Sequence, residues 1–326
     1  MGFSASSENA GIVFDVFGNN GEWNPDGNNA DVVTIGDNAY VWVKPIEMLT
    51  LKFGKIDNNW GRQDVCFGMC DHTYRFGGLR EGEGVAVKRE SGRGAEITLQ
   101  PIENLVIDYE ANIWCGNEHT YETMWEHSST MIGYTIPDVA FIRAVINGKE
   151  AGIQKATDTD TKPWCTIGLA ADVYAVENLW FTVGATVPTL IGSGNLVDIP
   201  VGLGASYKLD PITFHAIAKL NFIAKADGDD AKYEDVGLYF GVGVDYTIND
   251  MFDVIADFRF GDKKYVAGVN GEDPAFAAYL GLAQKLSNAT FDFGVQVGRN
   301  SGISYDTNAT DPQTTFAVPL MITPSF

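Results

Sequence analysis

"FGVGVDYTINDMFDVIADFRFG", residues 240–261, decides the fold, because apolar and polar residues alternate in it twice around a short polar break. A period of two is typical of a β-strand with two different faces, and the break predicts a tight turn between antiparallel strands. The apolar face then meets either a protein core or membrane hydrocarbon, and the two cases place the charges oppositely. The residues of that face are Phe240, Val242, Val244, Tyr246, Phe252, Val254, Ala256, Phe258 and Phe260.

The same hairpin pattern recurs along the whole chain. Each short polar break has an alternating segment on both sides, and longer segments rich in Gly, Asp and Asn separate one hairpin from the next. The longest of these segments spans about residues 58–91. The short breaks are "VKPIEMLTL" (43–51), "LQPIENLVI" (99–107), "TIPDVAF" (135–141), "YAVENLWF" (174–181), "YKLDPITF" (207–214), "YTINDMF" (246–252) and "QKLSNATF" (284–291).

This repeat predicts an all-β fold of about sixteen antiparallel strands, in which the last strand closes on the first. Short turns at one end and long loops at the other are typical of a transmembrane β-barrel. We expect residues 1–326 to form this single barrel domain, with short periplasmic turns and long extracellular loops. The predicted strands are 11–18, 32–44, 48–57, 92–101, 104–114, 128–136, 139–148, 164–175, 178–188, 197–209, 212–224, 236–248, 251–262, 276–286, 289–300 and 313–326.

The composition restricts the partners. Lys and Arg number 22 against 43 Asp and Glu, which gives a formal net charge of −21. This excess of carboxylates repels nucleic acid, so we expect no nucleic-acid partner. The sequence has no apolar run of the roughly 18 residues that a transmembrane helix needs. This absence does not exclude a membrane β-barrel, because the alternating hydrophobicity of its strands averages out along the chain.

Two interpretations of the apolar faces compete, a soluble two-sheet protein and a barrel in lipid. The faces are almost free of charge over about nine residues, which is the height of a bilayer core. Aromatic residues flank the short turns, as expected for an interfacial girdle. Both features favour lipid outside and water inside. The flanking aromatic residues are Trp180, Tyr207, Phe214, Tyr246, Phe252 and Phe291.

The end of the chain carries the most specific signal. In "TTFAVPLMITPSF" (314–326), apolar residues keep one phase up to the terminal Phe326. With the strand repeat, this end resembles the mature bacterial outer-membrane porins of the sixteen-stranded type. Pro319 and Pro324 depart from a regular strand, because Pro has no N–H to donate to the ladder.

The resemblance implies a location in the bacterial outer membrane and a water-filled channel for passive diffusion of small hydrophilic solutes and ions. It further implies contact with outer-membrane lipid, recognition of Phe326 by the barrel-assembly machinery, and a homotrimer. A barrel without an open pore, serving a structural or adhesive role through its loops, is the alternative. The start, "MGFSASSENAG", has neither the basic region nor the apolar core of a signal peptide, so we expect the printed chain to be a mature form.

The inward phase of the strands predicts a charged pore lining. Ionised side chains are costly in a dry core and are readily held in a water-filled lumen. Nine acidic residues against seven basic ones favour modest cation selectivity, although many of them could be paired wall residues. The predicted lining consists of Asp15, Glu96, Asp108, Glu110, Asp172, Asp245, Asp253, Asp257 and Asp292 with Lys44, Lys52, Arg143, Lys208, Lys219, Arg259 and Lys285.

Glycines also gather in the inward phase, among them Gly168, Gly184 and Gly294. Glycine in a strand marks either close approach of other backbone or a bend of the barrel wall, and both causes stay open. An inward-folded loop would explain the first case. The segment 58–91 is the candidate, and its basic residues could form a constriction, although the third loop (115–127) is the usual one in porins. The basic residues are Arg75, Arg80, Lys88 and Arg89.

Enzyme chemistry is not expected. "CFGMCDH" offers too few ligands for a zinc site, and a disulfide between Cys66 and Cys70 is the favoured interpretation. Cys115 and Cys165 could pair if their loops meet. No serine stands in a nucleophile-elbow motif, and no catalytic triad is recognisable. We therefore expect neither a cofactor nor a metal.

Overall fold

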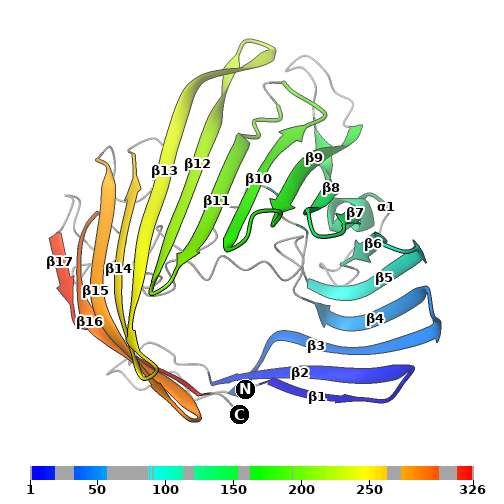
Figure 1. Cartoon of the computed structure of the whole chain (residues 1–326). Helices are drawn as coiled ribbons and strands as arrows, with labels where there is room; N and C mark the ends of the chain where they lie inside the picture. The colour runs from blue at the N-terminus through cyan, green and yellow to red at the C-terminus, as the bar shows by residue number, and fades with distance from the viewer. Residues whose placement is uncertain are drawn as a thin grey trace.

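The computed structural model of the chain describes residues 2–18, 33–56, 87, 89, 92–112, 121–152, 162–192, 194–262, 273–300 and 314–324. One antiparallel sheet contains all the strands and curves round on itself, which brings the last strands back toward the first (Figure 1). In the described part of the chain, the residue registers run in sequence order from β1 (Gly2–Ser6) to β18 (Leu320–Pro324). None of these registers joins the last strand to the first, so the closing seam stays a prediction.

The strands follow the alternating segments of the sequence. The first half of the sheet consists of β2 (Ala10–Gly18), β3 (Val33–Ile46), β4 (Leu49–Ile56), β5 (Gly92–Ile102), β6 (Leu105–Ala111), β7 (Ser128–Ile136), β8 (Ala140–Gly152) and β9 (Lys162–Val173). The second half consists of β10 (Leu179–Pro188), β11 (Ile199–Leu209), β12 (Ile212–Asp227), β13 (Asp230–Asn249), β14 (Phe252–Gly261), β15 (Ala275–Leu286), β16 (Ala289–Arg299) and β17 (Thr314–Ala317).

Burial is inverted relative to a water-soluble protein. On one face of the sheet large apolar side chains are exposed, for example Leu169 at 61% and Leu280 at 55%. On the other face, charged side chains are buried, and Arg143 and Arg259 are exposed by only 1% and 0%. Charged residues are almost never fully buried in soluble domains, whereas apolar-out and polar-in strands define a membrane barrel. The interpretation of the apolar face as the lipid face is therefore confirmed.

Two differences concern the ends of the sheet. β1 pairs with β2 from Gly2↔Asp15 to Ser6↔Gly11 and is an additional strand that the alternation did not predict. The predicted final strand is divided into β17 and β18 at Pro319. Its register does not change at the break, because Gln296 pairs with Ala317 and Phe293 with Leu320. The division therefore reflects the missing N–H of proline, and the two pieces act as one strand.

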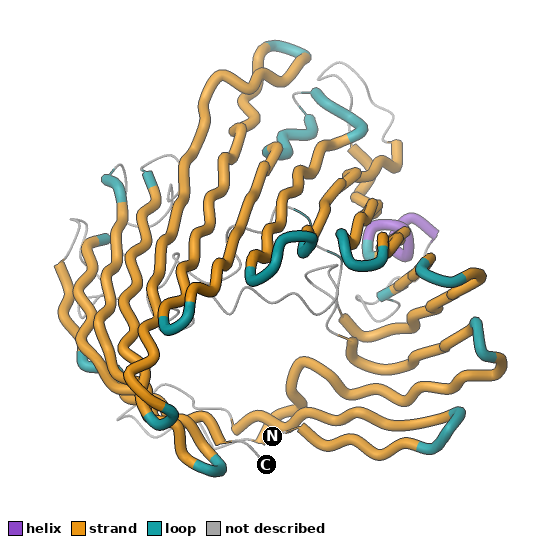
Figure 2. The backbone as a smooth tube through the Cα atoms, viewed as in Figure 1, coloured by secondary structure: helices purple, strands orange, loops and turns teal. Residues whose placement is uncertain are grey.

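The predicted strands 212–224 and 236–248 leave a long loop between them, and this prediction is wrong. β12 and β13 continue through it as a hairpin, and Figure 2 shows the two strands joined at the tip by a short turn. Gly228 provides the turn with a positive φ of 62°. Lys225 pairs with Asp235, and Lys232 Nζ lies 2.7 Å from Asp227 Oδ2. Apart from Asp229 in the turn, the acidic residues of this segment thus belong to strands, and lysines partly neutralise them.

The short helix α1 (Tyr121–Glu126) lies within the third predicted loop (115–127) and packs against β8. Trp125 Nε1 donates a hydrogen bond to the carbonyl of Trp164 at 2.8 Å, which ties the helix to β9. Among the described residues, no helix combines the length and hydropathy needed to cross a bilayer.

The aromatic girdle at the short turns is confirmed in part. Tyr207, Phe214 and Tyr246 are exposed on the lipid-facing phase of β11, β12 and β13. Trp180 is exposed as well, but it shares the phase of the buried Thr182 and so lies on the opposite face. Its placement in the girdle was wrong by one residue of strand phase.

Candidate functional site: the inner wall

The charged face of the curved sheet, called here the inner wall, carries the predicted lining residues. Each charged residue lies between two outward-facing apolar neighbours, so the strand alternation alone positions it. The buried members are Glu96, Asp108, Glu110, Arg143, Asp172, Asp257, Arg259 and Asp292. The half-buried members include Lys52, Lys219, Asp245 and Asp253.

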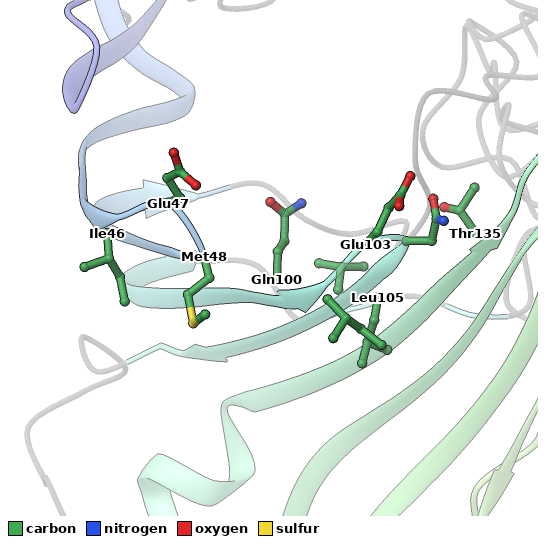
Figure 3. A pocket seen from close by; sticks show the side chains of 10 residues that line it. Ile46, Glu47, Met48, Gln100, Glu103, Leu105 and Thr135 are labelled. Carbon is green, nitrogen blue, oxygen red and sulfur yellow. The ribbon is translucent and has the colours of Figure 1, made fainter.

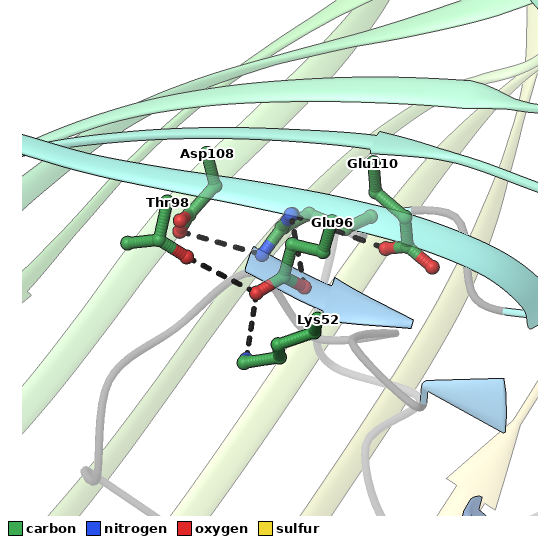
Figure 4. A network of polar contacts seen from close by, with 6 residues as sticks. Lys52, Glu96, Thr98, Asp108 and Glu110 are labelled. Carbon is green, nitrogen blue, oxygen red and sulfur yellow. Dashed lines mark hydrogen bonds and ion pairs between the residues drawn. The ribbon is translucent and has the colours of Figure 1, made fainter. Parts of the chain in front are cut away.

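Three carboxylates of β5 and β6, called here the acidic cage, surround the guanidinium of Arg89. The cage consists of Glu96, Asp108 and Glu110, whose closest oxygens lie 3.8, 3.6 and 3.9 Å from Arg89 nitrogens. Lys52 Nζ on β4 adds a second cation 2.6 Å from Glu96 Oε1. Figure 4 shows these groups together, with Thr98 donating a hydrogen bond to Glu96. Register places Lys52, Glu96 and Glu110 directly across from one another on three strands.

Val87 lies on another part of the inner wall, where it is 1% exposed. It packs against inward apolar side chains of β6 to β9. A Cβ added to Gly168 would lie 2.7 Å from a Val87 methyl carbon, closer than real contacts allow, and one added to Gly184 would lie 3.0 Å from the other methyl carbon, tighter than most real contacts. These two glycines therefore make room for a residue of the segment that precedes β5. The apolar partners are Val106, Met131, Phe141, Val145 and Ala170.

Other inward glycines have a different cause. A Cβ on Gly243 would collide with the carboxylate of Asp257, and one on Gly281 or Gly294 would collide with the ring of Tyr279. Here the glycines accommodate large side chains of the wall itself. The close approach of another segment, considered from the sequence, thus holds at Gly168 and Gly184, whereas the bend of the barrel wall stays a prediction.

Arg143 and Asp172 form a buried ion pair on β8 and β9. Arg143 Nη1 donates to Asp172 Oδ2 at 2.5 Å, and both side chains are fully buried. Thr182 on β10 donates to the second carboxylate oxygen at 2.5 Å. The pair is thereby fixed from three adjacent strands and acts as a structural tie of the wall.

The wall of β13 to β16 carries a second group of charges. Asp257, Arg259 and Asp292 are buried there, next to an apolar cluster of Ile255, Tyr279 and Ala283. Nearer the short turns, Lys285 Nζ lies 2.7 Å from Asp253 Oδ2. Charged and apolar residues thus share this wall, and the prediction of a charged lining did not include the apolar cluster.

A line of hydrogen bonds crosses β11, β12 and β13. Ser206 Oγ lies 3.2 Å from His215 Nδ1, and His215 Nε2 lies 3.0 Å from Asp245 Oδ2. Sequence reasoning missed this line, because its members come from three separate segments. The strands around it pair continuously, so their backbone N–H groups belong to the sheet ladder and do not form an oxyanion hole at this place. The arrangement binds the three strands together through polar side chains.

A cavity of about 730 Å³ lies at the short-turn end of the sheet. Figure 3 shows Glu47, Gln100 and Glu103 pointing to one side of the ribbon and Ile46, Met48 and Leu105 to the other. The turns β3–β4 and β5–β6 form most of its lining. This cavity lies at the rim, away from the charged groups of the inner wall.

Several predicted residues lie outside the described part of the chain. They are Cys66, Cys70, Arg75, Arg80, Lys88, Cys115 and Phe326. Of the predicted constriction, Arg89 is described, and it lies against the acidic cage. Within the described part of the chain Cys165 is a free thiol, and its Sγ lies 3.6 Å from Oγ1 of Thr189.

The apolar patch beneath Val87 was absent from the predicted site. Met131, Phe141 and Val145 face inward, where the alternation led us to expect polar residues. The segment "AFIRAVI" (140–146) carried the signal, because it is apolar in both phases. Apolar residues in both phases indicate a strand that is covered on both faces.

Solved structures from Pseudomonas aeruginosa share this fold over almost the whole chain. The outer-membrane protein OpdK is 12% identical, with a TM-score of 0.56 over 99% of this chain and 91% of its own. OpdK with vanillate gives 0.55 at 12% identity, over 97% and 86%. OpdQ gives 0.53 at 12% identity, over 98% and 87%. No protein-family model and no curated protein sequence matches the chain.

At 12% identity the comparison establishes the architecture. The expected resemblance to outer-membrane barrels of the porin type is confirmed at the level of the fold. One fold can host many activities, so the residues of the inner wall, and not the fold alone, determine the function.

Proposed function

We propose that this chain, which has the fold of the outer-membrane porins, is a water-filled channel for passive diffusion of small hydrophilic solutes. It lies in the bacterial outer membrane with its short turns in the periplasm. Solutes are selected by size and by the electric field of the inner wall. They are held weakly, because a channel has to release what it admits.

The observation that carries the proposal is the inverted burial of charge. Outward side chains such as Leu169, Leu280 and Phe293 offer lipid an apolar surface. Inward side chains such as Glu96, Arg143 and Asp257 line the enclosed side. A barrel of about sixteen strands is wide enough to enclose water. Water can solvate the half-buried inward groups Lys219, Asp245 and Asp253, whereas a buried group such as Arg143 is held by its ion pair with Asp172.

Modest cation selectivity is the finer part of the proposal. The chain carries a formal charge of −21, and carboxylates outnumber basic groups along the inner phase. A negative potential enriches cations within a Debye length of about 8–10 Å at ordinary salt. Arg89 in the acidic cage works against this excess, which is one reason to expect a modest preference.

Planar-bilayer recording tests the proposal. Purified, refolded protein should give discrete, ohmic current steps in KCl. The reversal potential across a KCl gradient should have the sign of a cation-preferring pore and should approach zero as the salt concentration is raised, because screening weakens the field.

Protein that inserts without conducting would refute the channel and favour the structural or adhesive barrel. A reversal potential with the sign of an anion-selective pore would still support a channel and would contradict only the proposed cation selectivity. The homotrimer and the role of Phe326 in assembly stay predictions, which chemical cross-linking and deletion of Phe326 would test.

A further inference from the structure

Val87 and Arg89, called here the clip, lie two residues apart and make contacts of opposite chemistry on the inner wall. Val87 enters the apolar patch of β6 to β9, and Arg89 enters the acidic cage of β5 and β6. Both residues are almost fully buried, with exposures of 1% and 6%. A segment that ran alongside the inner wall without binding to it would make neither of these contacts.

The wall is shaped to receive Val87. Gly168 on β9 and Gly184 on β10 lack the Cβ atoms that would collide with its methyl groups. The surrounding apolar side chains face inward, where water-filled channels normally present polar groups. This match in shape and chemistry fixes the position of the backbone two residues before Arg89.

The contacts of Arg89 are electrostatic. Its nitrogens lie 3.6 to 3.9 Å from the three carboxylates, longer than the roughly 2.7–2.9 Å of direct charge-assisted hydrogen bonds. Nε and Nη2 make no hydrogen bond within the described residues. The guanidinium thus lies among the three carboxylates without a tight pairing to any one of them.

We propose that the clip is a built-in counter-cation that sets the charge selectivity of the pore. The acidic cage is a site for a guanidinium-type cation, and Arg89 fills it from within the chain. The anchor at Val87 gives Arg89 a high effective concentration, so a free cation cannot compete. Arg89 is then a selectivity-determining residue, and Val87 is the positioning residue that holds it. This inference rests on the proposed channel function.

The first test replaces the charge. Arg89→Gln should raise the potassium-over-chloride permeability ratio by about twofold or more, because one unit of positive charge leaves the inner wall. Guanidinium chloride at millimolar concentration should reduce the current of Arg89→Gln and not that of the unaltered chain. Arg89→Lys should restore the ratio, since it restores the charge.

A matched control removes a different positive charge from the same wall. Lys285→Gln takes away a cation that pairs with one carboxylate, Asp253, outside the cage. It should produce no block by guanidinium. The anchor is tested by Gly184→Val, which fills the space of Val87 and should make the current sensitive to guanidinium although Arg89 is unchanged.

Heat-shifted migration on SDS gels shows first that each variant has folded. The inference is overturned if the unaltered chain conducts and folded Arg89→Gln shows neither a changed reversal potential nor a block by guanidinium. Block of Lys285→Gln as strong as that of Arg89→Gln would also overturn it, because the effect would then be a general loss of charge. An unaltered chain that never conducts would instead refute the proposed function.

Discussion

At the scale of single residues, Arg143 and Leu169 show how this chain reverses the usual rule. They lie on the paired strands β8 and β9, and their side chains leave the sheet on opposite faces. Arg143 is buried with Asp172, and Leu169 is exposed. A buried charge is tolerated when it is paired, and an exposed leucine costs nothing when the surrounding solvent is lipid.

Replacing only one residue of the Arg143–Asp172 ion pair should destabilise the protein. Arg143→Leu should lower the free energy of unfolding by about 3–5 kcal/mol, because Asp172 is left buried without its cation. The double variant Arg143→Leu with Asp172→Leu should recover most of the loss. Urea titration in lipid vesicles, followed by tryptophan fluorescence, measures both values. Equal losses in the single and double variants would contradict the assignment of the pair.

If the apolar face contacts lipid, the cost of placing a charge on it should depend on the depth of the residue in the bilayer. Leu280, halfway along β15, and Leu209, at the turn end of β11, are equally exposed. Leu280→Arg should cost about 2–4 kcal/mol near the bilayer midplane, and Leu209→Arg about 0–1 kcal/mol near the interface. The same urea titration compares them. Similar costs at both positions would show that exposure here is exposure to water.

At the scale of elements, the end of the chain shows how one residue interrupts a strand. Gly294 N donates to the carbonyl of Pro319 at 3.3 Å, but proline has no N–H to return the bond. The flanking register is unbroken, so the interruption is local. β17 and β18 therefore behave as a single strand with one missing rung.

Restoring the missing backbone hydrogen bond at position 319 should stabilise the pairing of the final strand with β16. Pro319→Val supplies an N–H opposite Gly294 and should raise the free energy of unfolding by about 0.5–1.5 kcal/mol. Hydrogen exchange of the Gly294 amide should slow at the same time. A matched change at the exposed neighbour, Val318→Thr, leaves the backbone pattern intact and should alter neither quantity much. A loss of stability in Pro319→Val would indicate that the break relieves strain.

At the scale of the whole molecule, consecutive antiparallel pairing satisfies the backbone of nearly every described strand within one sheet. A sheet of this kind in lipid opens only at high cost, because unpaired backbone groups have no water to bind. Inward charge and outward apolar surface then follow from strand alternation alone. The molecule as a whole is therefore expected to resist detergent in its folded form.

An SDS gel tests this expectation. An unboiled sample should migrate differently from a boiled one, and circular dichroism of the unboiled protein should be dominated by β-structure. Solubility without detergent, together with identical migration of the two samples, would favour a water-soluble sheet protein. The sample should be refolded in detergent or lipid before the comparison, so that the starting state is the folded one.

The sequence by itself determined the strand positions and the assignment of faces. Alternation has a period of two, so the phase of Phe293 or Leu280 fixes the phase of Asp292 or Tyr279 beside it. This is why the buried charges were predicted without a structure. The failures at β1 and at the β12–β13 hairpin occurred where short or polar segments carry weak alternation.

Only the tertiary structure decided which inward residues meet. The curvature of the sheet brings Val87 to Gly184, which is distant in the chain, and the strand registers align Ser206, His215 and Asp245 on the consecutive strands β11, β12 and β13. Arg89 reaches the acidic cage for the same reason. Alternation states which face a side chain joins. It contains no information on the three-dimensional path of the connecting segment, and that path places a cation among three carboxylates.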